Sequence, residues 1–185
     1  AKHSLDDGQY GARRAACERA AQILGVELLA DISAEDLPDA LERLAASATD
    51  QGAADAEELV KRTRHVVTEI DRTRKLVELL QDGRPLRGEK LAAAGELMDA
   101  SHESLRVDYE CTCPELDVAV EAARAAGAHG ARMTGGGFGG SAIALVDGDA
   151  VHDVAAAVAG AYEREGFNPP AFLDAVPAAP AGRLV

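Results

Sequence analysis

The chain has 185 residues, of which 47% are apolar and 3% aromatic, so Ala, Leu and Val must fill the core of one domain or one large part of a longer protein. Its 32 acidic and 19 basic residues give a net charge of −13, which excludes nucleic acid and an anionic membrane as partners because both require a basic surface. Three cysteines without framework spacing predict reduced thiols and a cytoplasmic location, and no apolar run is long enough to span a membrane.

Helical periodicity begins within ten residues of Ala1, and because the chain opens without methionine we expect a fragment. In chain order, the apolar spacing predicts a helix over residues 8–24, a short helix after Ser33, and helices over 50–80, 88–105 and 114–127. Strands are predicted over 131–134 and 141–146, followed by a helix over 150–165 and a last strand over 171–176. These elements predict an α+β domain, in which helices cover a small, mainly antiparallel sheet.

The most unusual stretch is residues 132–141, RMTGGGFGGS, which lies between two of the predicted strands. Such a glycine run needs a geometric reason, either positive φ angles or the close approach of another group, including an anion bound by backbone N–H groups. Gly135, Gly137 and Gly140 fit the dinucleotide pattern G-x-G-x-x-G, but that pattern must open a helix and here a strand follows. By itself the loop is either part of a ligand site or a tight hairpin.

Other polar residues suggest weaker alternatives. His65, His102, Ser101 and Ser104 raise the possibility of a hydrolase, but their spacing defines no Ser-His-Asp arrangement, and polar residues on helices are usually packed or capped. Cys111 and Cys113 form a C-x-C without a second pair or a histidine cluster nearby, so we expect no metal site. Glu110, Glu115 and Asp117 are expected to support the start of the following helix.

Several segments together resemble the galactokinases, a branch of the GHMP kinases. ARMTGGGFGGSAIALV is similar to the third, C-terminal motif of that group, and HSLDDGQYGARRAACERAA, RTRHVVTEIDRT and LMDASHESLRVDYECTCPELD resemble further galactokinase stretches in the same order. The first motif, which recognises the sugar, the serine-rich loop that holds ATP phosphates, and the aspartate base with its arginine partner have no counterpart here. The resemblance therefore implies that residues 1–185 are a GHMP-kinase C-terminal domain without the N-terminal sugar- and ATP-binding domain.

The resemblance also implies an activity and assigns residues to it. The full protein would transfer the γ-phosphoryl of Mg-ATP to the C1 hydroxyl of galactose, with ATP and Mg²⁺ bound mainly by the N-terminal domain of the same polypeptide. We expect no catalytic residue in this chain, which alone would be inactive. Tyr10 matches the tyrosine that lies against the bound sugar, the alternative being a half-buried core tyrosine, and Lys2 lies either near the transferred phosphate or in solvent.

The loop formed by Gly135, Gly136, Gly137, Phe138, Gly139 and Gly140 would line the active site, with Phe138 as its packing anchor. For Arg13 and Arg14 a structural salt bridge is favoured over substrate contact. The alternative to an enzyme part is a catalytically inactive, galactokinase-like sugar sensor or an interaction module. In either case we expect an apolar surface that meets the N-terminal domain to be exposed.

Overall fold

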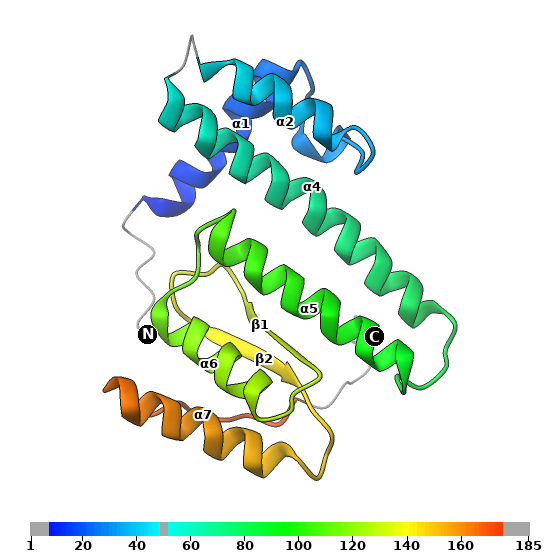
Figure 1. The fold of residues 1–185 in the computed structure, drawn as a ribbon, viewed down its shortest axis with the longest axis vertical. Helices are drawn as coiled ribbons and strands as arrows, with labels where there is room; N and C mark the ends of the chain where they lie inside the picture. The colour runs from blue at the N-terminus through cyan, green and yellow to red at the C-terminus, as the bar shows by residue number, and fades with distance from the viewer. Residues whose placement is uncertain (1–7, 49–51, 176–185) are drawn as a thin grey trace, which may run out of the picture.

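The computed structural model describes residues 8–48 and 52–175, which form helices around a two-stranded sheet (Figure 1). In chain order the elements are α1 (Gln9–Leu24), the 3-10 helix η1 (Leu29–Asp31), α2 (Leu37–Ala46), α4 (Ala53–Gln81), α5 (Glu89–Val107), α6 (Pro114–Ala125), β1 (Gly130–Thr134), β2 (Ser141–Leu145) and α7 (Val151–Glu165). The predicted α+β class is confirmed, and every predicted helix is present with shifts of a few residues at its ends.

Two apolar clusters hold the outer parts of the fold. At one end α1, α2 and the first half of α4 enclose a core in which Ala16, Leu44 and Leu59 are fully buried. At the other end α6 packs between α7 and the sheet, with Val120 and Ala131 at the centre of that contact. In Figure 1 the long helices α4 and α5 lie between these two regions and connect them.

Helix α5 lies unusually close to β1 and supplies partners for its outer edge. A Cβ on Gly95 of α5 would overlap the backbone carbonyl of His129, next to Gly130, so only glycine permits this approach. The Asp99 carboxylate then accepts a hydrogen bond from the Ala131 N–H at 2.9 Å, and Nδ1 of His102 accepts one from the Met133 N–H at 3.2 Å. The edge of β1 is therefore satisfied by helix side chains instead of by another strand.

The predicted strand, glycine loop and strand are confirmed. β1 and β2 are antiparallel, with Gly130 opposite Leu145 and Thr134 opposite Ser141, and residues 135–140 connect them. The predicted last strand over 171–176 is wrong for residues 171–175, which have no strand structure. Its apolar run fits a strand, but a strand needs a hydrogen-bonded neighbour, and Phe172 and Leu173 are instead 51% and 92% exposed.

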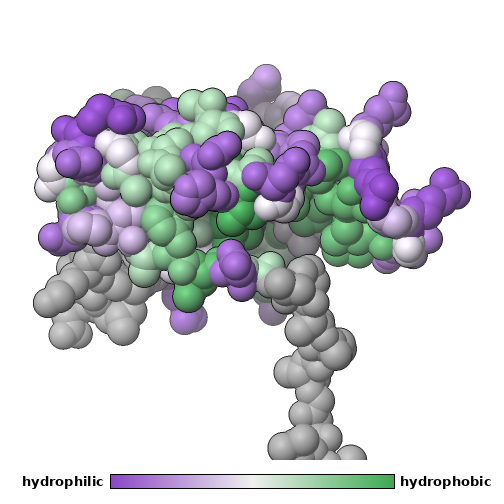
Figure 2. All heavy atoms as spheres, turned by 90° about the horizontal axis from the view of Figure 1, so that it is seen from below, coloured by the Kyte–Doolittle hydropathy of each residue, from purple (hydrophilic) through white to green (hydrophobic). Residues whose placement is uncertain are grey.

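Other large apolar side chains of the described residues are also exposed, among them Ile143 in β2 and Leu80 in α4. Figure 2 shows apolar surface on the face seen from below. Among the described helices, none combines the length and the apolar character that crossing a membrane requires.

Candidate functional site

Tyr10, in the first turn of α1, meets the glycine loop although 127 residues separate it from Gly137. Its hydroxyl donates a hydrogen bond to the Gly137 carbonyl oxygen at 3.4 Å. Its ring meets the Phe138 ring edge to face, with centroids 5.3 Å apart. Tyr10 and Phe138 are both half-buried, while Gly135 and Gly136 beside them are exposed. The structure thus brings together the aromatic and glycine residues that the sequence suggested.

The glycine content of the loop follows from its backbone and its contacts. Gly135, Gly137, Gly139 and Gly140 have φ angles between 86° and 130°, a region that other residues rarely adopt. Gly136 has an ordinary φ, but a Cβ there would lie 2.6 Å from the Tyr10 hydroxyl oxygen and 2.9 Å from Cε1 of the ring. The loop therefore needs its glycines for protein geometry alone, whatever it binds.

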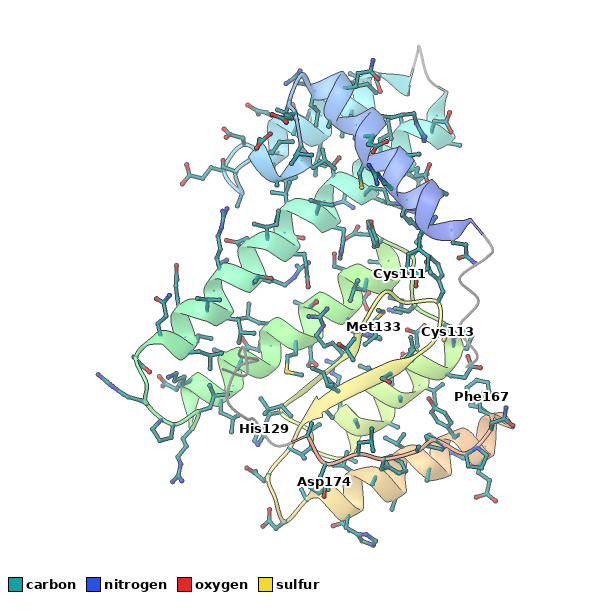
Figure 3. All side chains as sticks on the ribbon, turned by 180° about the vertical axis from the view of Figure 1, so that it is seen from behind. Cys111, Cys113, His129, Met133, Phe167 and Asp174 are labelled. Atoms are coloured by element: carbon teal, nitrogen blue, oxygen red, sulfur yellow. The ribbon has the colours of Figure 1, made fainter. Side chains whose placement is uncertain are left out.

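Residues 108–111, in the connection between α5 and α6, contact the glycine loop through Cys111. The Phe138 N–H donates to the Cys111 carbonyl oxygen at 2.6 Å. Phe138 has a φ of 56°, which is uncommon for a residue other than glycine. A Cβ on Gly137 would overlap the same carbonyl oxygen. Cys111 and Met133 of β1, both labelled in Figure 3, belong to one buried cluster against which Phe138 packs. Burial raises the pKa of the Cys111 thiol to about 11, so at neutral pH it is an uncharged packing group.

Arg13 and Arg14 have different roles. Arg14 forms the expected salt bridge within α1, to Glu18 at 2.7 Å, and both side chains are exposed. Among the described residues, the Arg13 side chain binds backbone carbonyls and not a carboxylate. Its guanidinium donates to the carbonyl oxygens of Tyr109 and Glu110 at 2.7 and 2.8 Å, and its Cζ lies 5.7 Å from the centroid of the Phe138 ring. Spacing along α1 could not show this, because the acceptors are backbone atoms 96 and 97 residues away.

Arg62 of α4, which the sequence suggested only as the partner of Glu58 in an exposed i,i+4 pair, is instead buried, with 2% exposure. It donates to the Asp108 carbonyl oxygen and pairs with the carboxylates of Glu110 at 2.7 Å and Glu58 at 3.2 Å. Burial alone would raise the pKa of Glu110, but hydrogen bonds from Arg62 and Lys61 outweigh it and hold that pKa below its ordinary value. Glu110 thus anchors residues 108–111 to α4. The sequence had suggested that it supports the start of α6, but α6 begins only at Pro114.

The polar residues that suggested a hydrolase form structural contacts. Nδ1 of His65 lies 3.0 Å from Oγ of Ser104, but that hydroxyl donates its proton to the Asp108 carboxylate, 3.1 Å away, instead of to the imidazole. All three groups are buried, so Ser104 is no accessible nucleophile.

Ser101 and His102, the other two of these residues, also form structural contacts. Ser101 donates to Glu69, and Nε2 of His102 lies 3.2 Å from Asp117. Burial lowers the pKa of His102 although the Asp117 carboxylate opposes it, so the imidazole is neutral between α5, α6 and β1.

Two other features of the described residues were candidates for a site, a metal-binding cluster and an open groove. The described ranges contain no group of three or more His, Cys, Asp or Glu side chains able to hold a metal ion, and Lys2 lies outside these ranges. An open groove of about 1040 Å³ lies between the end of α4 and the start of α5. Its charged lining is partly self-neutralised, as in the pair Lys90–Asp82. By contrast, α1, residues 108–111 and the glycine loop meet around Phe138, which the Tyr10 ring contacts. We therefore place the candidate site at Tyr10 and the loop.

Known proteins similar to this chain are sugar kinases. Residues 76–164 match the family model for the C-terminal domain of GHMP kinases. Galactokinase of Streptomyces coelicolor is 47% identical over 184 residues, covering 100% of this chain and 44% of that relative. The galactokinases of Mycobacterium tuberculosis and Haemophilus influenzae are 42% and 41% identical, over 92% and 88% of this chain and 42% and 39% of their own lengths. The chain thus spans less than half the length of these relatives.

A solved structure gives the same result. Lactococcus lactis galactokinase complexed with galactose matches with a TM-score of 0.75 and 35% identity, over 91% of this chain and 41% of that one. The similarity therefore extends over nearly the whole chain, including the parts outside the family model.

Proposed function

Since this chain belongs to the GHMP kinase family, with its C-terminal domain at residues 76–164, we propose that it is the C-terminal part of a galactokinase. The whole polypeptide transfers the γ-phosphoryl group of ATP to the C1 hydroxyl of galactose. The observation that supports this most is the convergence of Tyr10 and the glycine loop in a chain that aligns over its full length with galactokinases.

In this proposal the chain contributes one wall of the sugar pocket. The Tyr10 ring offers an apolar face to the hexose and its hydroxyl offers a polar partner. The loop at residues 135–140 holds the ring in place through Phe138 and the Gly137 carbonyl and shapes the adjoining surface. Because phosphoryl transfer depends on positioning and charge stabilisation, a rigid wall of this kind serves catalysis without supplying a reacting group. The catalytic base then belongs to the N-terminal domain, and this chain alone is inactive.

ATP and Mg²⁺ are assigned mainly to the N-terminal domain. Magnesium neutralises phosphate charge as it develops in such transfers. In residues 8–48 and 52–175, the side chains offer no set of carboxylates that fits the ion. The one residue proposed to lie near the transferred phosphate is Lys2, which is outside the described ranges.

The same proposal sets the partner and the compartment. The N-terminal domain of the same polypeptide is the partner, and the exposure of Ile143, Phe172 and Leu173 supports an apolar contact with it. A cytoplasmic location is supported by Cys17, Cys111 and Cys113, which are all free thiols.

Steady-state kinetics of the full-length polypeptide test the role of Tyr10. We expect Tyr10→Ala to raise the KM for galactose about tenfold or more, corresponding to at least about 1.4 kcal/mol, with a much smaller change in the KM for ATP. Tyr10→Phe isolates the hydroxyl and should have the smaller effect. Tyr162→Phe is the matched control, because it removes a phenol hydroxyl that donates to the Glu115 carbonyl oxygen, away from the loop.

Unchanged galactose kinetics in Tyr10→Ala would remove Tyr10 from the site. A full-length polypeptide that binds galactose and ATP without transferring phosphate would instead be a sugar sensor.

A further inference from the structure

The four consecutive backbone carbonyls of residues 108–111, next to the glycine loop, each accept a hydrogen bond from a distant part of the chain. The acceptors are the carbonyl oxygens of Asp108, Tyr109, Glu110 and Cys111. The first is bound by Arg62 of α4, the next two by Arg13 of α1 at 2.7 and 2.8 Å, and the last by the Phe138 N–H of the loop at 2.6 Å. Residues 108–111 thus join α1, α4 and the loop at one place.

The backbone of this segment is held in an unfavourable conformation by side-chain contacts. Glu110 has a φ of 52°, which disfavours a residue with a Cβ by roughly 1–2 kcal/mol. Its carboxylate pairs with Arg62 and with Lys61, which fixes the turn from the α4 side. The same turn exposes the carbonyls of Tyr109 and Glu110 to a single guanidinium, that of Arg13.

Arg13 is the group that links this segment to Tyr10. It lies three residues after Tyr10 on α1, so both side chains project from the same face of the helix. Its Nε and Nη2 donate to the two adjacent carbonyl oxygens of Tyr109 and Glu110. Its Cζ lies over the Phe138 ring, which Tyr10 also contacts. A lysine has the same charge but cannot form this two-pronged contact.

We propose that Arg13 is a positioning residue for the sugar pocket. It fixes the distance between α1 and the glycine loop by binding the carbonyls of Tyr109 and Glu110, and in this way it holds the Tyr10 ring against the loop. This inference rests on the proposed function for its effect on galactose, whereas its effect on the loop does not depend on any activity.

The test compares Arg13→Lys with Arg14→Lys in the full-length polypeptide. Arg14 is the matched control, because it is the neighbouring residue and its exposed pair with Glu18 tolerates lysine. We expect Arg13→Lys to speed hydrogen exchange about tenfold in peptides that cover residues 134–141, where the Phe138 N–H lies. It should also raise the KM for galactose about fivefold to tenfold, with the KM for ATP and the urea midpoint near their wild-type values. Arg14→Lys should change none of these quantities.

A double variant separates positioning from general stability. In a Tyr10→Ala background the Arg13→Lys change should no longer raise the galactose KM, because the ring that Arg13 holds is gone. If Arg13→Lys does not fold, Phe138→Leu tests the same link from the loop side, since it removes the ring under the guanidinium and leaves the carbonyls intact. It should give the same faster loop exchange and a raised galactose KM.

Unchanged loop exchange in Arg13→Lys, or in Phe138→Leu where that variant replaces it, would overturn the inference. So would equal effects of Arg13→Lys and Arg14→Lys, or a galactose effect that persists undiminished in the Tyr10→Ala background. Faster loop exchange in a polypeptide that does not phosphorylate galactose would support the link from Arg13 to the loop while refuting the proposed function.

Discussion

Gly136 has no side chain, and this leaves the space that the Tyr10 ring occupies against the loop. The sequence identified the loop and Tyr10 separately, and only the resemblance to a known family suggested that they share a site. It did not indicate that Arg13 and Arg62 bind residues 108–111, because these contacts are made to backbone carbonyls, which any sequence would offer.

Substitution of Gly136 therefore tests the contact between loop and ring. A Cβ at this position would lie 2.6 Å from the Tyr10 hydroxyl oxygen, so we expect Gly136→Ala to displace the ring and raise the galactose KM several-fold in the full-length polypeptide. The urea midpoint should change little, since Gly136 is exposed and its φ suits alanine. Gly148→Ala, at an open position with an ordinary φ, is the control and should leave the KM unchanged. A wild-type KM in Gly136→Ala would show that the ring and the loop do not form one site.

Another prediction at the residue scale concerns His65, which is buried between Ser104 and the Tyr109 ring. Burial lowers its pKa from 6.5 to about 4, so below pH 6.5 the unfolded chain binds a proton that the folded chain does not. The stability contributed by neutral His65 is present above pH 6.5 and is lost as the pH falls towards 4, by about 3 kcal/mol in all.

Urea unfolding at pH 7 and pH 4.5 measures this loss. We expect the wild-type chain to lose about 2 kcal/mol more between these two pH values than His65→Gln does. The exposed His152 provides the control, and His152→Gln should behave like the wild type. Equal losses in wild type and His65→Gln would mean that His65 does not titrate below its ordinary range in the folded state.

At the scale of elements, periodicity predicted the helices and the two strands around the loop well, because each is set by its own apolar pattern. It predicted a strand at 171–176 that residues 171–175 do not form, because a strand also depends on a neighbour that local pattern cannot supply. Nor could periodicity show that α5 would take the place of a strand beside β1. That arrangement depends on Gly95 and Asp99, which the sequence did not single out, and on His102, which it suggested only for a hydrolase.

The contact between α5 and β1 gives a sharp test. Gly95→Ala would place a Cβ against the His129 carbonyl, 2.6 Å from its carbon, and backbone on both sides leaves no side chain to move away. We expect a loss of more than about 3 kcal/mol in the free energy of unfolding. Gly160→Ala in α7 is the matched control, because its nearest neighbour is the flexible end of Arg164 at 3.4 Å. Alanine there should be neutral or stabilise by up to about 1 kcal/mol. Similar stabilities for the two variants would contradict the close packing of α5 on β1.

At the scale of the whole molecule, the family suggested by the motifs is confirmed by relatives at 41–47% identity and by a solved galactokinase, and the α+β class predicted from periodicity is confirmed by the fold. The chain spans less than half the length of those relatives. In the proposed enzyme, the functional groups are therefore divided between this chain and the rest of the polypeptide. The structure shows Tyr10 and Phe138 in contact, and it shows Arg13 of α1 and Arg62 of α4 bound to residues 108–111 beside them. We propose that Tyr10, Phe138 and the glycine backbone form one wall of the sugar pocket. A sugar kinase also needs a base and a phosphate site, and we propose that the rest of the polypeptide supplies both.

Product formation by two proteins, the full-length polypeptide and the 185-residue chain, is the measurement to make. Both would be incubated with Mg-ATP and galactose, and galactose 1-phosphate would be quantified against time. We predict galactose-dependent product from the full-length polypeptide and none from the 185-residue chain. Product from the chain alone would contradict the assignment of the base and the phosphate site to the rest of the polypeptide. A full-length polypeptide that binds both substrates and forms no product would contradict the kinase function itself.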